Sequence, residues 1–86
     1  ARFERGEPMV NVRYFAAAAE AAGTESEQVE AATLGELLSA ITGTRDARFA
    51  DVLGQCSLLL DGRYVTDPAT PLGAGTLDVL PPFAGG

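Results

Sequence analysis

The chain has 86 residues, of which 47% are hydrophobic and 21% charged, and a formal net charge of −6. Its six cationic side chains are all arginines and form no basic cluster. The composition therefore argues against binding to nucleic acids or to anionic membranes, which both require concentrated positive charge. With no histidine and one cysteine, a single chain cannot build a structural zinc site, a disulfide or a nucleophile paired with histidine.

The composition is that of one small globular domain. The first residues lack the apolar stretch of a secretory signal, and no apolar run is long enough to span a membrane. Together with the lack of disulfides, this leads us to expect a cytoplasmic protein. We expect residues 1–8 to form a flexible extension, with Met9 as an alternative start, residues 9–80 to form the domain, and residues 81–86 to form an extended tail.

Local patterns predict eight short elements. Residues 9–15 alternate with period two, which is typical of a strand with one buried face. Other segments show helical spacing or end at glycines. In chain order we predict a strand at 9–15, a short helix at 16–23, a polar edge strand at 24–32 antiparallel to the first, the main helix at 33–43, a second helical segment at 45–55, and strands at 56–60, 63–65 and 76–80.

Two local signals support this order. Thr33 and Glu36 form a capping box at the start of the main helix. Asp61-Gly62 suits a type I′ turn between two strands. Two strands, a main helix and three further strands predict an α+β fold of the β-grasp type, with a mixed sheet of about five strands, the main helix on one face, and short helical segments. On pattern alone, ferredoxin-like and other α+β folds remain alternatives.

Strand phase separates an inner from an outer face of the predicted sheet. Phe15, Tyr64 and Leu80 fall in the outward phase, where they form either a contact patch or strand-end residues covered by loops or the tail. We expect Cys56 to be a buried core thiol, because free cysteine is among the most buried residue types. The residues expected to build the core are Val10, Val12, Tyr14, Leu58, Leu60, Leu77 and Val79 of the strands, packed on Leu34, Leu37, Leu38 and Ile41 of the main helix.

The C-terminal tail is chemically unusual. Two prolines fix φ and remove two N–H donors, so the last strand must end before them. After an aromatic residue, the end has almost no side-chain bulk and could enter a narrow channel with its carboxylate leading. The tail consists of Pro81, Pro82, Phe83, Ala84, Gly85 and Gly86.

Four features taken together point to a known protein family. They are the segment VRYFAAAAEAAG near the start, the capping-box helix, the LDGRYV hairpin and the segment DVLPPFAGG at the end. Over residues 9–86 it resembles the MoaD/ThiS family of ubiquitin-like sulfur carriers. Within that family it is most similar to the branch of molybdopterin synthase small subunits. The resemblance also implies the β-grasp fold.

The resemblance implies a sulfur-carrying cycle. An E1-like, MoeB-like enzyme would use ATP to adenylate the carboxylate of Gly86, which is then converted to a thiocarboxylate. The tail would insert into a MoaE-like large subunit, in a heterotetramer, and give its sulfur to the pterin precursor. Phe15, Tyr64 and Leu80 would meet both partners in turn. The chain would bind no metal and no permanent cofactor, and it would be a non-catalytic subunit.

Three other functions remain open on the sequence. The chain could carry sulfur for thiamin thiazole, cysteine or another thio-metabolite. It could be a ubiquitin-like modifier joined to substrate lysines through Gly86. It could also be a β-grasp binding module with an inert tail.

Overall fold

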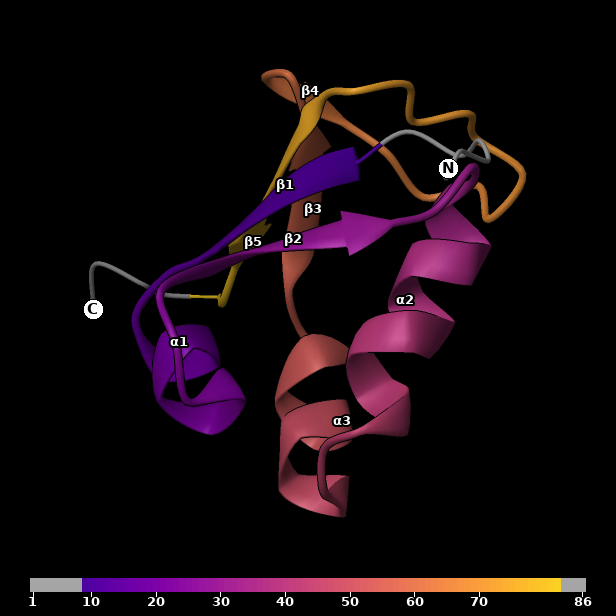
Figure 1. The fold of residues 1–86 in the computed structure, drawn as a ribbon. Helices are drawn as coiled ribbons and strands as arrows, with labels where there is room; N and C mark the ends of the chain where they lie inside the picture. Colours follow the sequence, from indigo (N-terminus) through magenta and orange to yellow (C-terminus); the bar gives the residue numbers. More distant parts are fainter. Residues whose placement is uncertain (1–8, 83–86) are drawn as a thin grey trace.

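The computed structural model describes residues 9–82 (Figure 1). The extension predicted at residues 1–8 and the tail from Phe83 to Gly86 lie outside the described residues. Each predicted element is present; the last strand has the predicted bounds, and the other elements are shorter than predicted. The elements are β1 (Met9–Tyr14), α1 (Ala17–Ala22), β2 (Ser26–Glu30), α2 (Leu34–Gly43), α3 (Ala47–Leu53), β3 (Ser57–Leu60), β4 (Arg63–Tyr64) and β5 (Thr76–Leu80).

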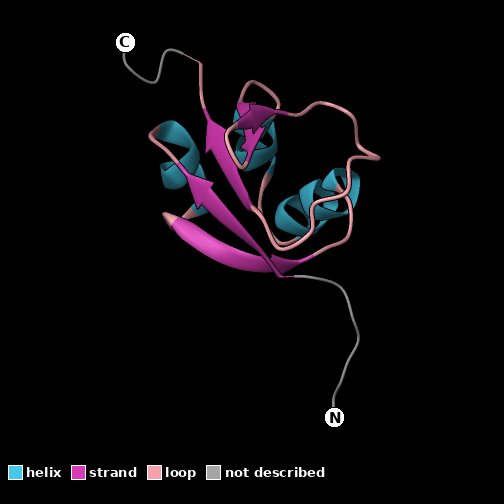
Figure 2. Ribbon diagram, turned by 90° about the horizontal axis from the view of Figure 1, so that it is seen from above, coloured by secondary structure: helices cyan, strands magenta, loops and turns pink. Residues whose placement is uncertain are grey.

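The five strands form one mixed sheet in the order β2-β1-β5-β3-β4. The first hairpin is antiparallel, as predicted, whereas β1 and β5 run parallel at the centre of the sheet. Helix α2 lies along one side of the sheet (Figure 1), and the view from above shows α1 and α2 at opposite sides of the molecule (Figure 2). This is the predicted β-grasp arrangement. None of the helices in residues 9–82 is long and apolar enough to cross a membrane.

The core lies between the sheet and the helices. The predicted inner-face residues of β1 and β5 are all buried, as are three of the four predicted helix residues. Leu38 is only partly buried, and so are Leu58 and Leu60 of β3. Leu58 and Leu60 are only partly buried because β3 lies near the edge of the sheet, where only the two-residue β4 lies beyond it. The buried hydrophobic residues are Val10, Val12, Tyr14, Ala18, Ala31, Leu34, Leu37, Ile41, Phe49, Leu72, Leu77 and Val79.

The predicted capping box and the predicted Asp61-Gly62 turn are both present. The Thr33 hydroxyl accepts a hydrogen bond from the backbone N–H of Glu36 at 3.3 Å, and Glu36 accepts one from the N–H of Ala32 at 3.0 Å. The side chain of Glu36 therefore reaches one residue beyond the usual capping-box partner. Asp61 and Gly62 have φ of 50° and 86°, the two positive values that a type I′ turn requires.

An arginine joins several elements beside the core. The guanidinium of Arg45 lies 5.0 Å from the ring centre of Phe49 and 5.5 Å from that of Tyr14, and it pairs with Glu27 at 2.9 Å. Its Nε also donates to the carbonyl of Ala22 at the end of α1, at 3.1 Å. The Tyr14 hydroxyl donates to Glu27, and burial together with this bond raises the pKa of Tyr14. A terminal nitrogen of Arg45 donates to the carbonyl of Ile41 in α2 at 3.0 Å. Arg45 thereby connects α1, β2 and α2 around the two aromatic rings.

Candidate functional site

The tail begins at the central strand of the sheet. β5 ends at Leu80, and two prolines follow, as predicted. Because Val79 pairs with Tyr14 on one side and with Leu58 on the other, the origin of the tail is held from both sides. Pro81 is partly buried and Pro82 is exposed. The chain therefore leaves the sheet at a position fixed by strand pairing on both sides.

We call the face of the sheet opposite α2 the outer face. The strand register places Arg13 beside Asp78, Asp78 beside Leu59, and Leu59 beside Tyr64, so these residues form one row across four strands. Phe15 lies two residues after Arg13, just past the end of β1, and its N–H donates to the carbonyl of Val79 at 3.2 Å. It is therefore next to the end of β5.

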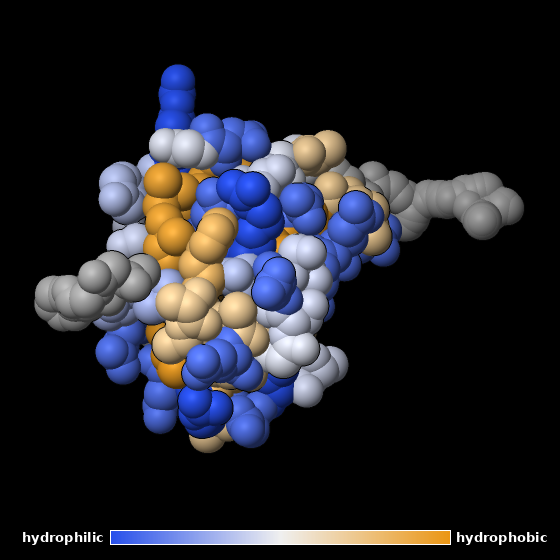
Figure 3. Space-filling model, turned by 90° about the vertical axis from the view of Figure 1, so that its left-hand side faces the viewer, coloured by the Kyte–Doolittle hydropathy of each residue, from blue (hydrophilic) through white to orange (hydrophobic). Residues whose placement is uncertain are grey.

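The three residues predicted for a contact patch do not form one compact cluster. Phe15, 37% exposed, lies beside the partly buried Leu80 at the origin of the tail. Tyr64, 75% exposed, lies on the far edge strand of the same face. Leu59, which our prediction omits, lies between β5 and Tyr64. Period-two alternation could have found it, because Leu58 and Leu60 point inward. Figure 3 shows hydrophobic side chains gathered on this side of the molecule.

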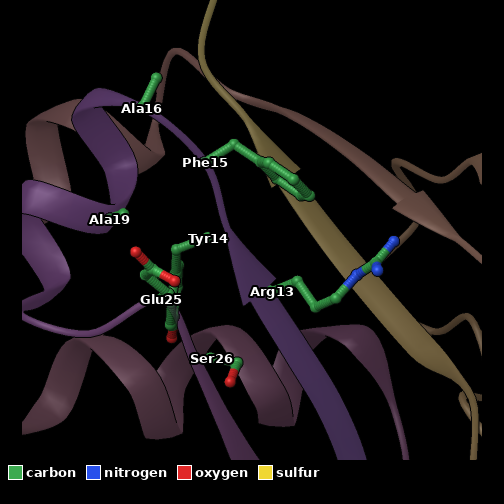
Figure 4. Close-up of a pocket in the computed structure, with 7 residues that line it drawn as sticks. All are labelled: Arg13, Tyr14, Phe15, Ala16, Ala19, Glu25 and Ser26. Atoms are coloured by element: carbon green, nitrogen blue, oxygen red, sulfur yellow. The ribbon is translucent and has the colours of Figure 1, made fainter.

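Arg13 and Asp78, at one end of this row, form an ion pair. Arg13 donates to both carboxylate oxygens of Asp78, from Nε at 2.7 Å and from a terminal nitrogen at 3.0 Å. The same guanidinium lies 5.6 Å from the ring centre of Phe15. In Figure 4 the side chains of Arg13 and Phe15 both reach toward β5. The parallel register of β1 and β5 brings these two residues, 65 positions apart in the sequence, into contact.

A surface hollow of about 450 Å³ lies between the end of β1, the start of α1 and β2 (Figure 4). Its walls mix small apolar side chains with charged ones at the rim. Within residues 9–82, no three His, Cys, Asp or Glu side chains come together in a way that could hold a metal ion. The residues lining the hollow are Arg13, Tyr14, Phe15, Ala16, Ala19, Glu25 and Ser26.

Ala16, at the rim of this hollow, has a strained backbone, with φ of 52° and ψ of −127°. Such angles are readily adopted only by glycine and cost another residue about 1–3 kcal/mol. We expect Ala16→Gly to raise the free energy of unfolding by about 1 kcal/mol, since part of the relieved strain is offset by the greater freedom of glycine in the unfolded chain. Urea unfolding measures the change.

Ala17→Gly is the matched control for this prediction. Ala17 is exposed and begins α1 without a positive φ, so the same substitution there should lower stability by up to about 1 kcal/mol. Equal losses at both positions would contradict the strain at Ala16.

Cys56 lies close to the origin of the tail, because the neighbouring Ser57 pairs with Leu80. Its thiol is partly buried, packs against the core, and donates to the carbonyl of Val52 at 3.2 Å. Burial raises the pKa of Cys56, so the thiol stays protonated at neutral pH. A protonated, hydrogen-bonded thiol is a poor nucleophile.

Comparisons with known proteins agree with this geometry. The model of the ThiS family matches residues 12–86. A crystal structure of small archaeal modifier protein 1 from Haloferax volcanii is 26% identical, with a TM-score of 0.74 over 91% of this chain and 99% of its own. A complex of subunits 1 and 2 of molybdopterin-converting factor from Helicobacter pylori gives 28% identity and a TM-score of 0.70 over 91% of this chain and 99% of the matched chain.

A third structure extends the likeness in fold. Small archaeal modifier protein 1 from Methanosarcina acetivorans is 22% identical, with a TM-score of 0.77 over 95% of this chain and all of its own, and at this identity it shows the fold alone. Curated protein sequences gave no match.

Proposed function

Because this chain belongs to the ThiS family of ubiquitin-like sulfur carriers, we propose that it carries sulfur as a thiocarboxylate on Gly86 and delivers it as the small subunit of molybdopterin synthase. The observation that carries the proposal is the diglycine tail, which follows a central strand paired on both sides. The molybdopterin-converting factor complex from Helicobacter pylori supports the choice of pathway.

The proposed chemistry uses no side chain of this chain. An oxygen of the Gly86 carboxylate attacks the α-phosphorus of ATP on an E1-like activating enzyme, which forms an acyl adenylate and releases pyrophosphate. Sulfur at the hydrosulfide level then displaces AMP at the acyl carbon and leaves a thiocarboxylate. On the large subunit, that sulfur replaces an oxygen substituent at a carbon of the pterin precursor, whose carbon–oxygen bond breaks. Water then cleaves the acyl–sulfur bond, which restores the carboxylate of Gly86 and leaves the sulfur on the pterin.

The chain's own residues position this chemistry. Pro81 and Pro82 restrict the backbone directly after the sheet, so fewer conformations of the tail are lost when it binds in a channel. Phe83 gives the tail one large apolar side chain as an anchor, and the residues after it have little bulk. The outer face beside the origin of the tail offers Phe15 and Leu59 for contact with each partner in turn.

A second candidate is a protein modifier joined to lysines of other proteins through Gly86. The likeness to small archaeal modifier protein 1 from Haloferax volcanii favours this candidate. Both candidates share the adenylated carboxylate and differ in the nucleophile that attacks it. Sulfur gives a carrier, whereas a lysine amine gives an isopeptide bond.

Mass spectrometry of the intact chain tests the proposal. We expect the chain, incubated with the activating enzyme of its own organism, ATP and a sulfur donor, to gain the mass difference of one oxygen replaced by sulfur. The loaded chain, mixed with the large subunit, should then convert the pterin precursor. An unchanged mass with an active enzyme would refute the carrier function, and lysine-linked products in cells would favour the modifier.

Cys56→Ser is the control variant for this experiment. Because the Cys56 thiol is protonated and hydrogen bonded, we expect the variant to gain the same mass at the same rate as the wild type. Loss of loading in Cys56→Ser would place the sulfur on the side chain rather than on the terminus.

A further inference from the structure

In the part of the chain that the structure describes, one ion pair lies on the outer face, and its two members are unequally exposed. The Arg13 side chain is 51% exposed, whereas that of Asp78 is 19% exposed. A protein approaching this face therefore meets the guanidinium rather than the carboxylate. On a chain with a net charge of −6, this is an exposed guanidinium next to the apolar side chains of Phe15 and Leu59.

Arg13 is held in place before any partner arrives. Asp78 takes two of its N–H groups, and the ring of Phe15 lies 5.6 Å from the guanidinium. An arginine fixed in this way loses less conformational entropy on binding than a free one. Within residues 9–82, the N–H groups that do not donate to Asp78 make no other hydrogen bond, and they remain available for an acceptor.

Burial of this face sets a chemical requirement on the partner. A purely apolar surface over Arg13 would leave its remaining N–H groups without hydrogen bonds, and such a loss is costly for a charged group. A cationic surface would be repelled, because the compensating carboxylate of Asp78 is largely covered. A carboxylate fits best, since the planar guanidinium can donate two parallel hydrogen bonds to it.

Building on the proposed function, we infer that Arg13 is the specificity-determining residue of the outer face. The large synthase subunit places an aspartate or glutamate side chain against Arg13, within an apolar surface that covers Phe15 and Leu59. Asp78 holds the guanidinium in the orientation that receives this carboxylate.

Isothermal titration of the full-length chain with the large synthase subunit of the same organism tests this inference. We expect Arg13→Leu to weaken binding by about tenfold to a hundredfold, as for loss of a charge-assisted hydrogen bond, although leucine enlarges the apolar area. Arg13→Lys should lose less, because it keeps the charge without the paired geometry. Higher salt should weaken wild-type binding more than that of Arg13→Leu.

Arg63→Ala is the matched control. Arg63 is exposed on β4 but pairs with Leu60, so its side chain belongs to the opposite face. We expect its binding to stay within about twofold of the wild type. Should Arg13→Leu fail to fold, Arg13→Gln keeps a polar side chain at this exposed position and should show the same loss.

The outcomes separate this inference from the proposed function. Wild-type binding together with equal or tighter binding of Arg13→Leu would overturn the role of Arg13 and leave the proposed function intact. Wild-type chain that does not bind the large subunit at all would overturn both.

Discussion

A chain that lacks Gly86 is expected to lose sulfur loading completely while unfolding at the same urea concentration as the wild type. The carboxylate would then belong to Gly85, one residue short of the position at which the proposed activating enzyme would adenylate it. A displacement of the reacting group by about 1 Å already costs roughly a hundredfold in rate, and one residue spans about 3.3–3.6 Å. Intact-mass spectrometry after incubation with the activating enzyme, ATP and a sulfur donor measures the loss.

Addition of one alanine after Gly86 is the complementary variant. It keeps both glycines and displaces the carboxylate in the other direction, so we expect the same loss of loading. Phe83→Ala keeps the same number of residues before the carboxylate, so we expect this variant to be loaded with sulfur. Its defect should appear as weaker binding to the large subunit. Normal loading of the chain without Gly86 would show that this carboxylate is not the carrier group.

The second large effect concerns stability. Phe49 of α3 is completely buried. Its ring centre lies 5.9 Å from that of Tyr14 in an edge-to-face arrangement and 5.0 Å from the guanidinium of Arg45. Phe49→Ala removes these contacts and leaves a cavity that the sheet cannot readily fill. We expect a loss of about 3–5 kcal/mol in the free energy of unfolding, measured by urea denaturation.

Such a loss is a large part of the stability of a small domain, and Phe49→Leu provides a measurable intermediate, with an expected loss of about 1–3 kcal/mol. Arg48→Ala, at the exposed neighbouring position, should change stability by less than about 0.5 kcal/mol. If Phe49→Ala cost no more than Arg48→Ala, Phe49 would not be a core residue.

Much of the fold was predictable because its signals are local. The alternation around Val10 and Val12 assigns their strand and its buried face, and the Asp61-Gly62 pair assigns the turn between β3 and β4. The capping box assigns the start of α2. Each of these signals depends on the side chains and the backbone conformation of a few consecutive residues. Residues far along the chain do not change these signals.

The candidate site was predictable only in part. The prolines after Leu80 indicated where the last strand ends, and the phase of Phe15 placed it on the outer face. Leu58 and Leu60, in contrast, follow the inward phase but are only partly buried, because burial depends on what lies beyond β3 in the sheet. Strand phase specifies a direction, whereas neighbouring elements decide how much of a side chain is covered.

The sequence by itself determined the order of the elements, the faces of the strands and the chemistry of the tail. Only the tertiary structure decided that Arg13 meets Asp78, 65 positions away, that Leu59 lies beside Asp78, and that Arg45 connects three elements around the aromatic rings. Strand register and helix docking are set by the packing of the whole core, because a shift of one residue would exchange the buried and exposed faces of a strand. Residues distant in sequence therefore become partners only when that packing is complete.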